Sequence, residues 1–109
     1  MGESDLTPEQ VDGMRAGAQL IDVREDYEWD EGRIEGARHI SLGQVAAAAE
    51  SIDRDRPVVF YCRTGARSGM ATQAFRKAGY DAYNMVGGLE RWAGEGRPLE
   101  PADGSVASH

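Results

Sequence analysis

The sequence predicts an α/β fold in which helices cover a parallel sheet. The chain has 109 residues, a length that fits one domain with a single modest core. Residues 57–61 form a continuous β-branched and aromatic run, as expected of a central parallel strand that is buried on both faces. Candidate strands alternate with candidate helices along the chain, which is the pattern that βαβ units produce.

The first three elements follow from capping residues and short apolar runs. Thr7 can cap a helix that has Pro8 at its first position, and Gln10 is placed to complete a capping box. Residues 18–23 are the first candidate strand because they contain a short apolar run. Residues 25–31 form a short acidic helical turn that a glycine ends.

The remaining elements lie on either side of the central strand. Residues 37–40 are a second candidate strand, and residues 41–50 are predicted as a helix because a serine can cap it and its apolar side chains share one face. After the central strand, residues 68–78 are predicted as a helix that a glycine stops. Residues 80–85 then form another strand and residues 89–93 a final helical turn.

Composition excludes several classes of function. Nineteen acidic against twelve basic residues give a net charge of -7, which argues against nucleic acids and anionic membranes as partners. No apolar run approaches the roughly 20 residues of a membrane span, and the start of the chain does not resemble a secretory signal. With one cysteine and two distant histidines, His39 and His109, we expect no metal site and no cofactor. A single free thiol also predicts a reducing compartment, the cytoplasm.

Cys62 is the candidate catalytic residue because of its surroundings. It stands directly after the central strand and before a helix, and ligands of open α/β sheets bind outside the carboxyl ends of the strands. Backbone N–H groups and the positive end of the helix dipole at such a turn lower the pKa of a thiol. Arg63 and Arg67 add positive charge, and Gly65 permits a tightly curved backbone. The pattern therefore predicts a reactive thiolate.

Several segments in the expected order resemble rhodanese domains. The resemblance to the active-site loop of that family comprises Cys62, Arg63, Thr64, Gly65, Ala66, Arg67 and Ser68. Residues 20–24 resemble the early strand with its Asp-x-Arg, residues 28–37 the Gly-His-Ile-x-Gly-Ala signature, and residues 84–92 the closing Gly-Gly…Trp element. Arg33 occupies the position of the signature histidine, where we expect a structural role.

The resemblance implies a central, mostly parallel five-stranded sheet flanked by helices on both faces, over residues 1–99. Residues 100–109 offer little to bury, and we expect a flexible tail there. The family implies a sulfurtransferase in which Cys62 takes a sulfane sulfur from a small anionic donor such as thiosulfate. The persulfide would then pass the sulfur to an external thiol, cyanide or a thioredoxin-like partner, while loop amides hold the donor.

The roles of the charged residues and the activity itself have alternatives. Asp22 and Arg24 are expected to brace the loop or its flanks, Arg63 either binds the donor or is an ordinary surface side chain, and Arg67 shapes the loop or its anion site. Cys-based phosphatases use Cys-x5-Arg, but here Cys62 and Arg67 give Cys-x4-Arg, a smaller ring that favours sulfur over a phosphoryl group. A sulfur carrier or interaction domain for one dedicated partner is the main alternative, ahead of a phosphatase or arsenate reductase.

Overall fold

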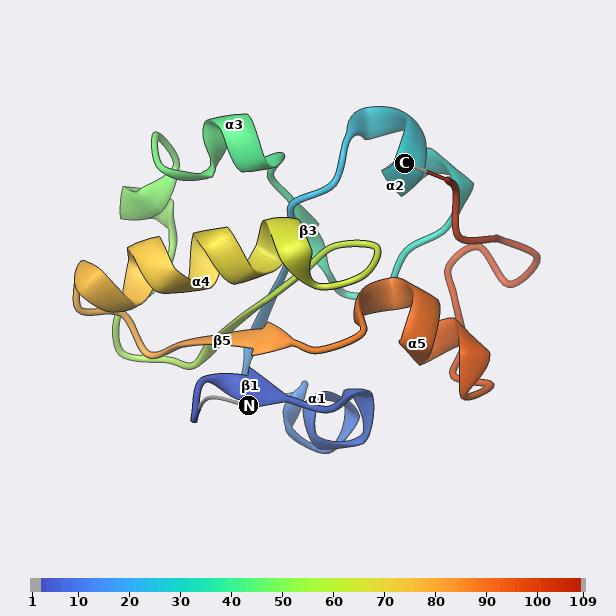
Figure 1. Cartoon of the computed structure of the whole chain (residues 1–109), viewed down its shortest axis with the longest axis horizontal. Coiled ribbons are helices and arrows are strands. Elements are labelled where there is room, and N and C mark those ends of the chain that lie inside the picture. Colours follow the sequence, from blue (N-terminus) through green and yellow to red (C-terminus); the bar gives the residue numbers. More distant parts are fainter. Residues whose placement is uncertain (1–2, 109) are drawn as a thin grey trace.

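A parallel sheet forms the centre of the computed structural model, which describes residues 3–108 (Figure 1). Within these residues its five strands are Asp5–Leu6 (β1), Gln19–Asp22 (β2), Arg38–His39 (β3), Val58–Tyr61 (β4) and Ala82–Met85 (β5). They lie in the order β1-β5-β4-β2-β3, and every neighbouring pair is parallel. The predicted α/β fold is therefore confirmed, with β4 in the middle of the sheet as the apolar run indicated.

Helices cover both faces of this sheet, as expected. They are Pro8–Met14 (α1), Asp26–Glu31 (α2), Leu42–Val45 (α3), Ala66–Lys77 (α4) and Gly88–Gly94 (α5), with a 3-10 turn at Ala49–Ser51. Figure 1 shows α3 and α4 on one side of the sheet and α1 on the other, and α5 packs with α1. None of these helices is long and apolar enough to cross a membrane among the residues that the structure describes.

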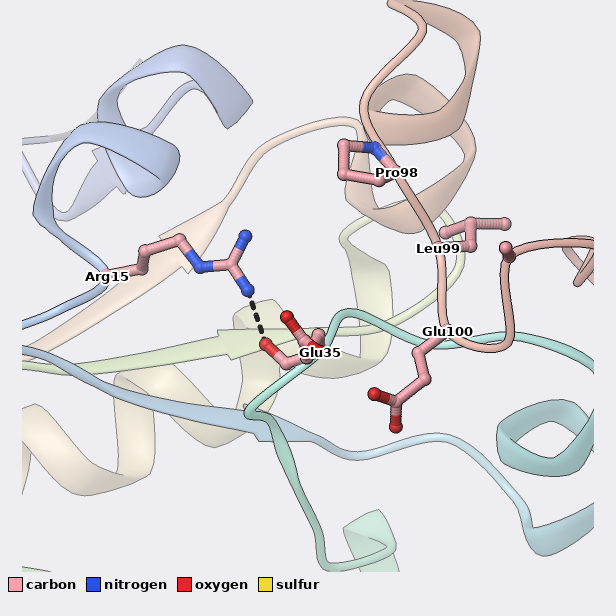
Figure 2. A pocket seen from close by; sticks show the side chains of 6 residues that line it. Arg15, Glu35, Pro98, Leu99 and Glu100 are labelled. Atoms are coloured by element: carbon pink, nitrogen blue, oxygen red, sulfur yellow. Dashed lines mark hydrogen bonds between the residues drawn. The ribbon is translucent and has the colours of Figure 1, made fainter.

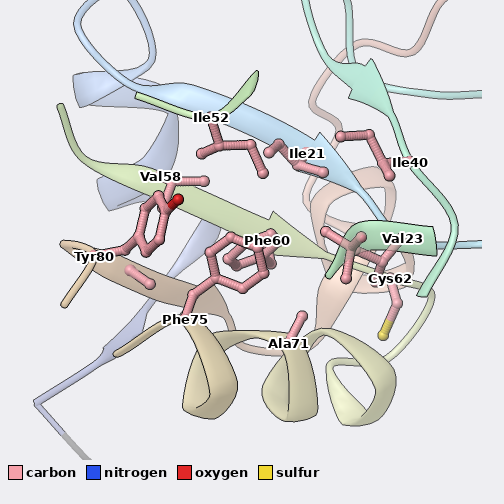
Figure 3. Packing of buried hydrophobic residues seen from close by; sticks show 12 residues of the cluster. Ile21, Val23, Ile40, Ile52, Val58, Phe60, Cys62, Ala71, Phe75 and Tyr80 are labelled. Atoms are coloured by element: carbon pink, nitrogen blue, oxygen red, sulfur yellow. The ribbon is translucent and has the colours of Figure 1, made fainter. Parts of the chain in front are cut away.

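The alternation of side chains along β4 divides the core in two. Val58 and Phe60 belong to the cluster beneath α4, whereas Val59 and Tyr61 belong to the cluster that includes Trp92 of α5. All four strand residues are completely buried. The next position in the same alternation is Cys62, so its side chain lies on the α4 side (Figure 3).

Most element boundaries differ from the sequence-based expectation by one or two residues, and three differences have a physical reason. β1 was not located, because two residues are too short a run to show a period. The helix expected over residues 41–50 is interrupted: α3 ends at Val45 and Ser51 N–H donates to Ala48 O at 2.9 Å in a tighter turn, which brings Ile52 into the core. The alanine run favours a helix intrinsically, but burial of Ile52 overrides that preference. α4 begins at Ala66 rather than at Ser68.

The expected flexible tail comprises residues 100–109, of which residue 109 lies outside the described residues. Residues 100–108 run past α2 (Figure 1). Glu100 exchanges backbone hydrogen bonds of 2.7 and 3.0 Å with Arg33, and Ser105 N–H donates to Glu31 O at 2.8 Å. Val106 packs against the core cluster on the α1/α5 side of the sheet, which includes Trp92. These contacts define the position of residues 100–108. Their flexibility stays a prediction, which hydrogen exchange can test.

Candidate active site

The loop that follows β4 brings Cys62 to the first turn of α4. Gly65 has a φ of 107°, a left-handed conformation that glycine adopts without strain, and it caps the helix. Ala66, Arg67 and Ser68 are then the first three residues of α4. The N–H groups of a first helical turn have no partner within the helix, so they are free to donate into the loop.

These free donors converge on the Cys62 sulfur. Gly65 N–H lies 3.1 Å from Sγ, Ser68 N–H 3.4 Å and the Ser68 hydroxyl 3.3 Å. Burial raises the pKa of the Cys62 thiol, but hydrogen bonds from Ser68, Gly65 and Thr64 N–H outweigh it, so the pKa lies below its ordinary value. The arrangement therefore favours a thiolate, as the sequence predicted, and the groups that lower the pKa are hydrogen-bond donors of the loop and of α4.

Asn84 of β5 supports this cradle and was not predicted. Its side-chain N–H donates to Gly65 O at 3.1 Å, and its carbonyl oxygen accepts from the Ser68 hydroxyl at 2.6 Å. The single hydroxyl proton of Ser68 is thus divided between Asn84 and Sγ. Asn84 is 9% exposed and lies within a strand. Its position in the sequence does not indicate that its side chain contacts the Cys62 loop.

Arg67 forms an ion pair with Glu28 of α2. Two hydrogen bonds of 2.7 and 2.9 Å join its guanidinium to both oxygens of the Glu28 carboxylate, which is fully buried. The desolvation of burial would raise the pKa of Glu28, but its bonds with Arg67 lower it below the ordinary value. The pair fixes the Arg67 side chain beside the loop, and both roles considered for Arg67 stay predictions. Glu28 was not predicted as a site residue, because the sequence does not distinguish it from the other acidic residues of the same helical turn.

Asp22 and Arg24 form a second buried ion pair near the site. The Arg24 guanidinium donates to Asp22 at 2.7 to 3.1 Å and to Gly32 O at 2.7 Å, and both side chains are completely buried. The pair ties the end of β2 to the residue after α2, and therefore fixes the helix that carries Glu28. No hydrogen bond from this pair to Cys62 is found among the described residues, so its contribution to the site is indirect.

Arg63 lies in the same loop but pairs with α5. Its Nη2 lies 3.0 Å from Glu90 Oε2, and the two side chains are 34% and 56% exposed. Both loop arginines thus have a carboxylate partner in the structure. The expected excess of positive charge at the loop is consequently smaller than the sequence suggested.

Two glycines, Gly87 at the N-cap and Gly88 as the first residue of α5, allow that helix to dock on the loop. Leu89 N–H donates to Cys62 O at 2.8 Å and Glu90 N–H to Arg63 O at 3.0 Å. A Cβ on Gly88 would lie 2.5 Å from the carbonyl oxygens of Cys62 and Arg63, and its φ is +58°. Only glycine permits this approach, which explains physically why α5 begins with a glycine.

A hollow of about 260 Å³ lies apart from this site (Figure 2). Its lining includes Arg15, Glu35 and Glu100, and Arg15 donates to the backbone oxygen of Glu35. None of its lining residues belongs to the loop that carries Cys62. Across residues 3–108, no group of three or more His, Cys, Asp or Glu side chains is arranged to hold a metal ion.

Comparisons with known proteins agree with this architecture. A family model described as the rhodanese-like domain matches residues 7–95. The thiosulfate sulfurtransferase GlpE of Pseudomonas aeruginosa is 38% identical over 102 residues, covering 92% of this chain and 89% of that protein. The uncharacterized protein YqhL of Bacillus subtilis is 44% identical over 91 residues, covering 83% and 72%.

Solved structures show the same fold. The rhodanese-related protein of Thermoplasma volcanium superimposes with a TM-score of 0.83 at 23% identity, over 87% of this chain and 95% of that one. The fold of the chain is thus that of a known domain type. On these grounds the chain belongs to the rhodanese-like domain family.

Proposed function

We propose that this protein is a sulfurtransferase that carries sulfur as a persulfide on Cys62. The observation that carries the proposal is the convergence of the Thr64, Gly65 and Ser68 donors on a thiol whose pKa is thereby lowered. A thiolate is the nucleophile that sulfur transfer requires. The relative GlpE, named a thiosulfate sulfurtransferase, supports the reaction class.

The chemistry takes place in two displacements at sulfur. The Cys62 thiolate attacks the sulfane sulfur of thiosulfate, a new S–S bond forms, and sulfite leaves with the electron pair of the bond that breaks. The loop N–H groups then hold the persulfide anion in place of the thiolate. An acceptor nucleophile attacks the outer sulfur, and the Cys62 thiolate departs in its original state.

The acceptor must come from outside the chain, because Cys62 is its only cysteine. A low-molecular-weight thiol, cyanide or a reduced thioredoxin-like protein can provide the second nucleophile. This cycle requires no metal or other cofactor. A reducing compartment such as the cytoplasm suits a working thiol.

Intact-mass analysis tests the proposal. The protein is incubated with thiosulfate and, separately, with a polysulfide, and a gain of one sulfur atom is expected on the wild-type chain but not on Cys62→Ser. The serine variant is nearly isosteric and should fold normally, which circular dichroism checks. A chain that gains no sulfur from either donor would contradict the proposal and favour the interaction-domain alternative.

A further inference from the structure

The two loop arginines are held by their carboxylate partners to different degrees. Arg67 is locked onto a fully buried carboxylate, and removing one partner from a buried pair is strongly unfavourable. The pair of Arg63 with Glu90 is different, since both of its side chains are partly exposed. Exposed ion pairs contribute little free energy and open readily.

The Arg63 guanidinium also has unused hydrogen-bonding capacity. Its Nε is covered and has no hydrogen-bond partner among the residues that the structure describes. Glu90 is held beside the loop by its own backbone N–H bond to Arg63 O, so its carboxylate remains near the guanidinium. An anionic donor and Glu90 therefore compete for the same cation, and the carboxylate also repels the donor.

We propose that Glu90 is a specificity residue that acts through Arg63 and disfavours donors of high negative charge. The inference rests on the proposed sulfur transfer. By occupying Arg63, the carboxylate weakens binding of a dianion such as thiosulfate more than binding of a singly charged donor. The site is thereby biased toward thiosulfonates and persulfides, which bear less charge than thiosulfate.

Glu90→Gln is the informative change because it keeps the size of the side chain and removes its charge. For thiosulfate we expect KM to fall about fivefold, equivalent to about 1 kcal/mol of binding. For methanethiosulfonate, which has a single charge, Coulomb's law scales the same effect to about twofold. In both cases kcat should change little, because Glu90 bonds to none of the reacting atoms.

Two controls separate this effect from a general change in charge. Asp55 is exposed and precedes β4, at the opposite end of that strand from Cys62, so Asp55→Asn removes the same unit of charge far from the loop. It should leave both KM values within about 1.5-fold, as expected for a screened distant charge. In an Arg63→Ala background, Glu90→Gln should lower KM much less than in the wild type.

The same competition is measurable without turnover. Sulfate is a dianion that transfers no sulfur, and it should protect Cys62 from iodoacetamide at about fivefold lower concentration in Glu90→Gln. Unchanged or weaker protection, an unchanged or higher KM for thiosulfate, or an equal fall in Asp55→Asn would each overturn the inference. Absence of transfer in the wild type would instead refute the proposed function, and the sulfate measurement would still decide the role of Glu90.

Discussion

Cys62 is positioned by the two-residue period of β4. Val58 and Phe60 leave the strand on the α4 side, and the next position of the same alternation directs the Cys62 sulfur to the start of that helix (Figure 3). A shift by one residue would turn the sulfur toward the α1/α5 side, away from the free N–H groups of α4. The reactivity of the thiol is thus a consequence of strand register as much as of residue type.

The Ser68 hydroxyl is expected to lower the pKa of the thiol. Ser68→Ala removes one donor to Sγ while the backbone N–H groups remain. A hydrogen bond to a charged group contributes about 1.5–3 kcal/mol, but Ser68 shares this proton with Asn84. We therefore expect Cys62 to be alkylated about three- to tenfold more slowly at neutral pH in the variant. The rate of Cys62 alkylation against pH should shift to higher pH.

Thr72→Val is a matched control for this change. Thr72 lies one turn further along α4, and its buried hydroxyl donates to Ser68 O at 2.8 Å without touching the sulfur. The valine removes the hydroxyl and keeps the shape. An alkylation profile that moved equally in both variants, or in neither, would contradict the role given to Ser68.

The residues of the site were predictable in unequal measure. Cys62 and its loop were visible because strand, cysteine, glycine and helix are local in the sequence. Glu28, Asn84 and Glu90 were not, since each reaches the loop only after other elements have brought it there. For the same reason, the sequence showed two arginines in the loop but not the carboxylates that pair with them.

Among the elements, α2 has the largest indirect effect on the loop. Its Glu28 binds Arg67 in the first turn of α4, so one buried ion pair joins two helices that are distant in the sequence. Glu28 is the only buried residue of the short α2. The pair therefore decides how α2 lies against the loop.

Glu28→Gln should destabilise the fold and reduce its sensitivity to acid. Breaking one side of a buried pair costs about 3 kcal/mol at neutral pH. Because the folded pKa of Glu28 is lowered, its contribution is complete above the unfolded pKa of about 4.3 and is lost as the pH falls through the lower folded pKa. Urea unfolding at several pH values from neutral to acidic measures this effect. The difference in the free energy of unfolding between wild type and Glu28→Gln should become smaller as the pH falls.

Glu31→Gln provides the comparison on the same helix. Glu31 is exposed, so its substitution should leave the free energy of unfolding within about 0.5 kcal/mol. A gap between wild type and Glu28→Gln that stayed constant, or widened, at low pH would show that the carboxylate charge is not responsible.

Element boundaries were predictable where the signal is local. Thr7 and Gln10 form the expected capping box at the start of α1. β1 was missed because its two residues acquire meaning only by pairing with β5, which follows more than 70 residues later. Long-range pairing of so short a segment leaves no periodic trace in the sequence.

For the molecule as a whole, the least constrained part is the segment after α5. Residues 100–108 are held by a few backbone hydrogen bonds, a bond from the Tyr27 hydroxyl to Ser108 O, the Arg33–Glu100 ion pair and the packing of Val106. We therefore keep the prediction that this segment opens at much lower free energy than β4. A substitution at Gly32 tests this prediction, because a Cβ there would lie 2.4 Å from Ser105 O.

Gly32→Ala should therefore displace the segment at a cost of about 1 kcal/mol or less. Hydrogen exchange is expected to speed up in residues 101–108 and to stay slow in β4. A loss of several kcal/mol together with faster exchange throughout the sheet would mean that the segment is an integral part of the fold.

The central claim is that Cys62 holds the transferred sulfur covalently, and a single-turnover measurement tests it most directly. The protein is mixed with excess thiosulfate in the absence of any acceptor, and released sulfite is followed with time. With one cysteine and no internal acceptor, we predict a burst of about one sulfite per Cys62 followed by a plateau, which added cyanide should convert into continuous release. Continued release without an acceptor, or a burst of equal size in Cys62→Ser, would contradict the account.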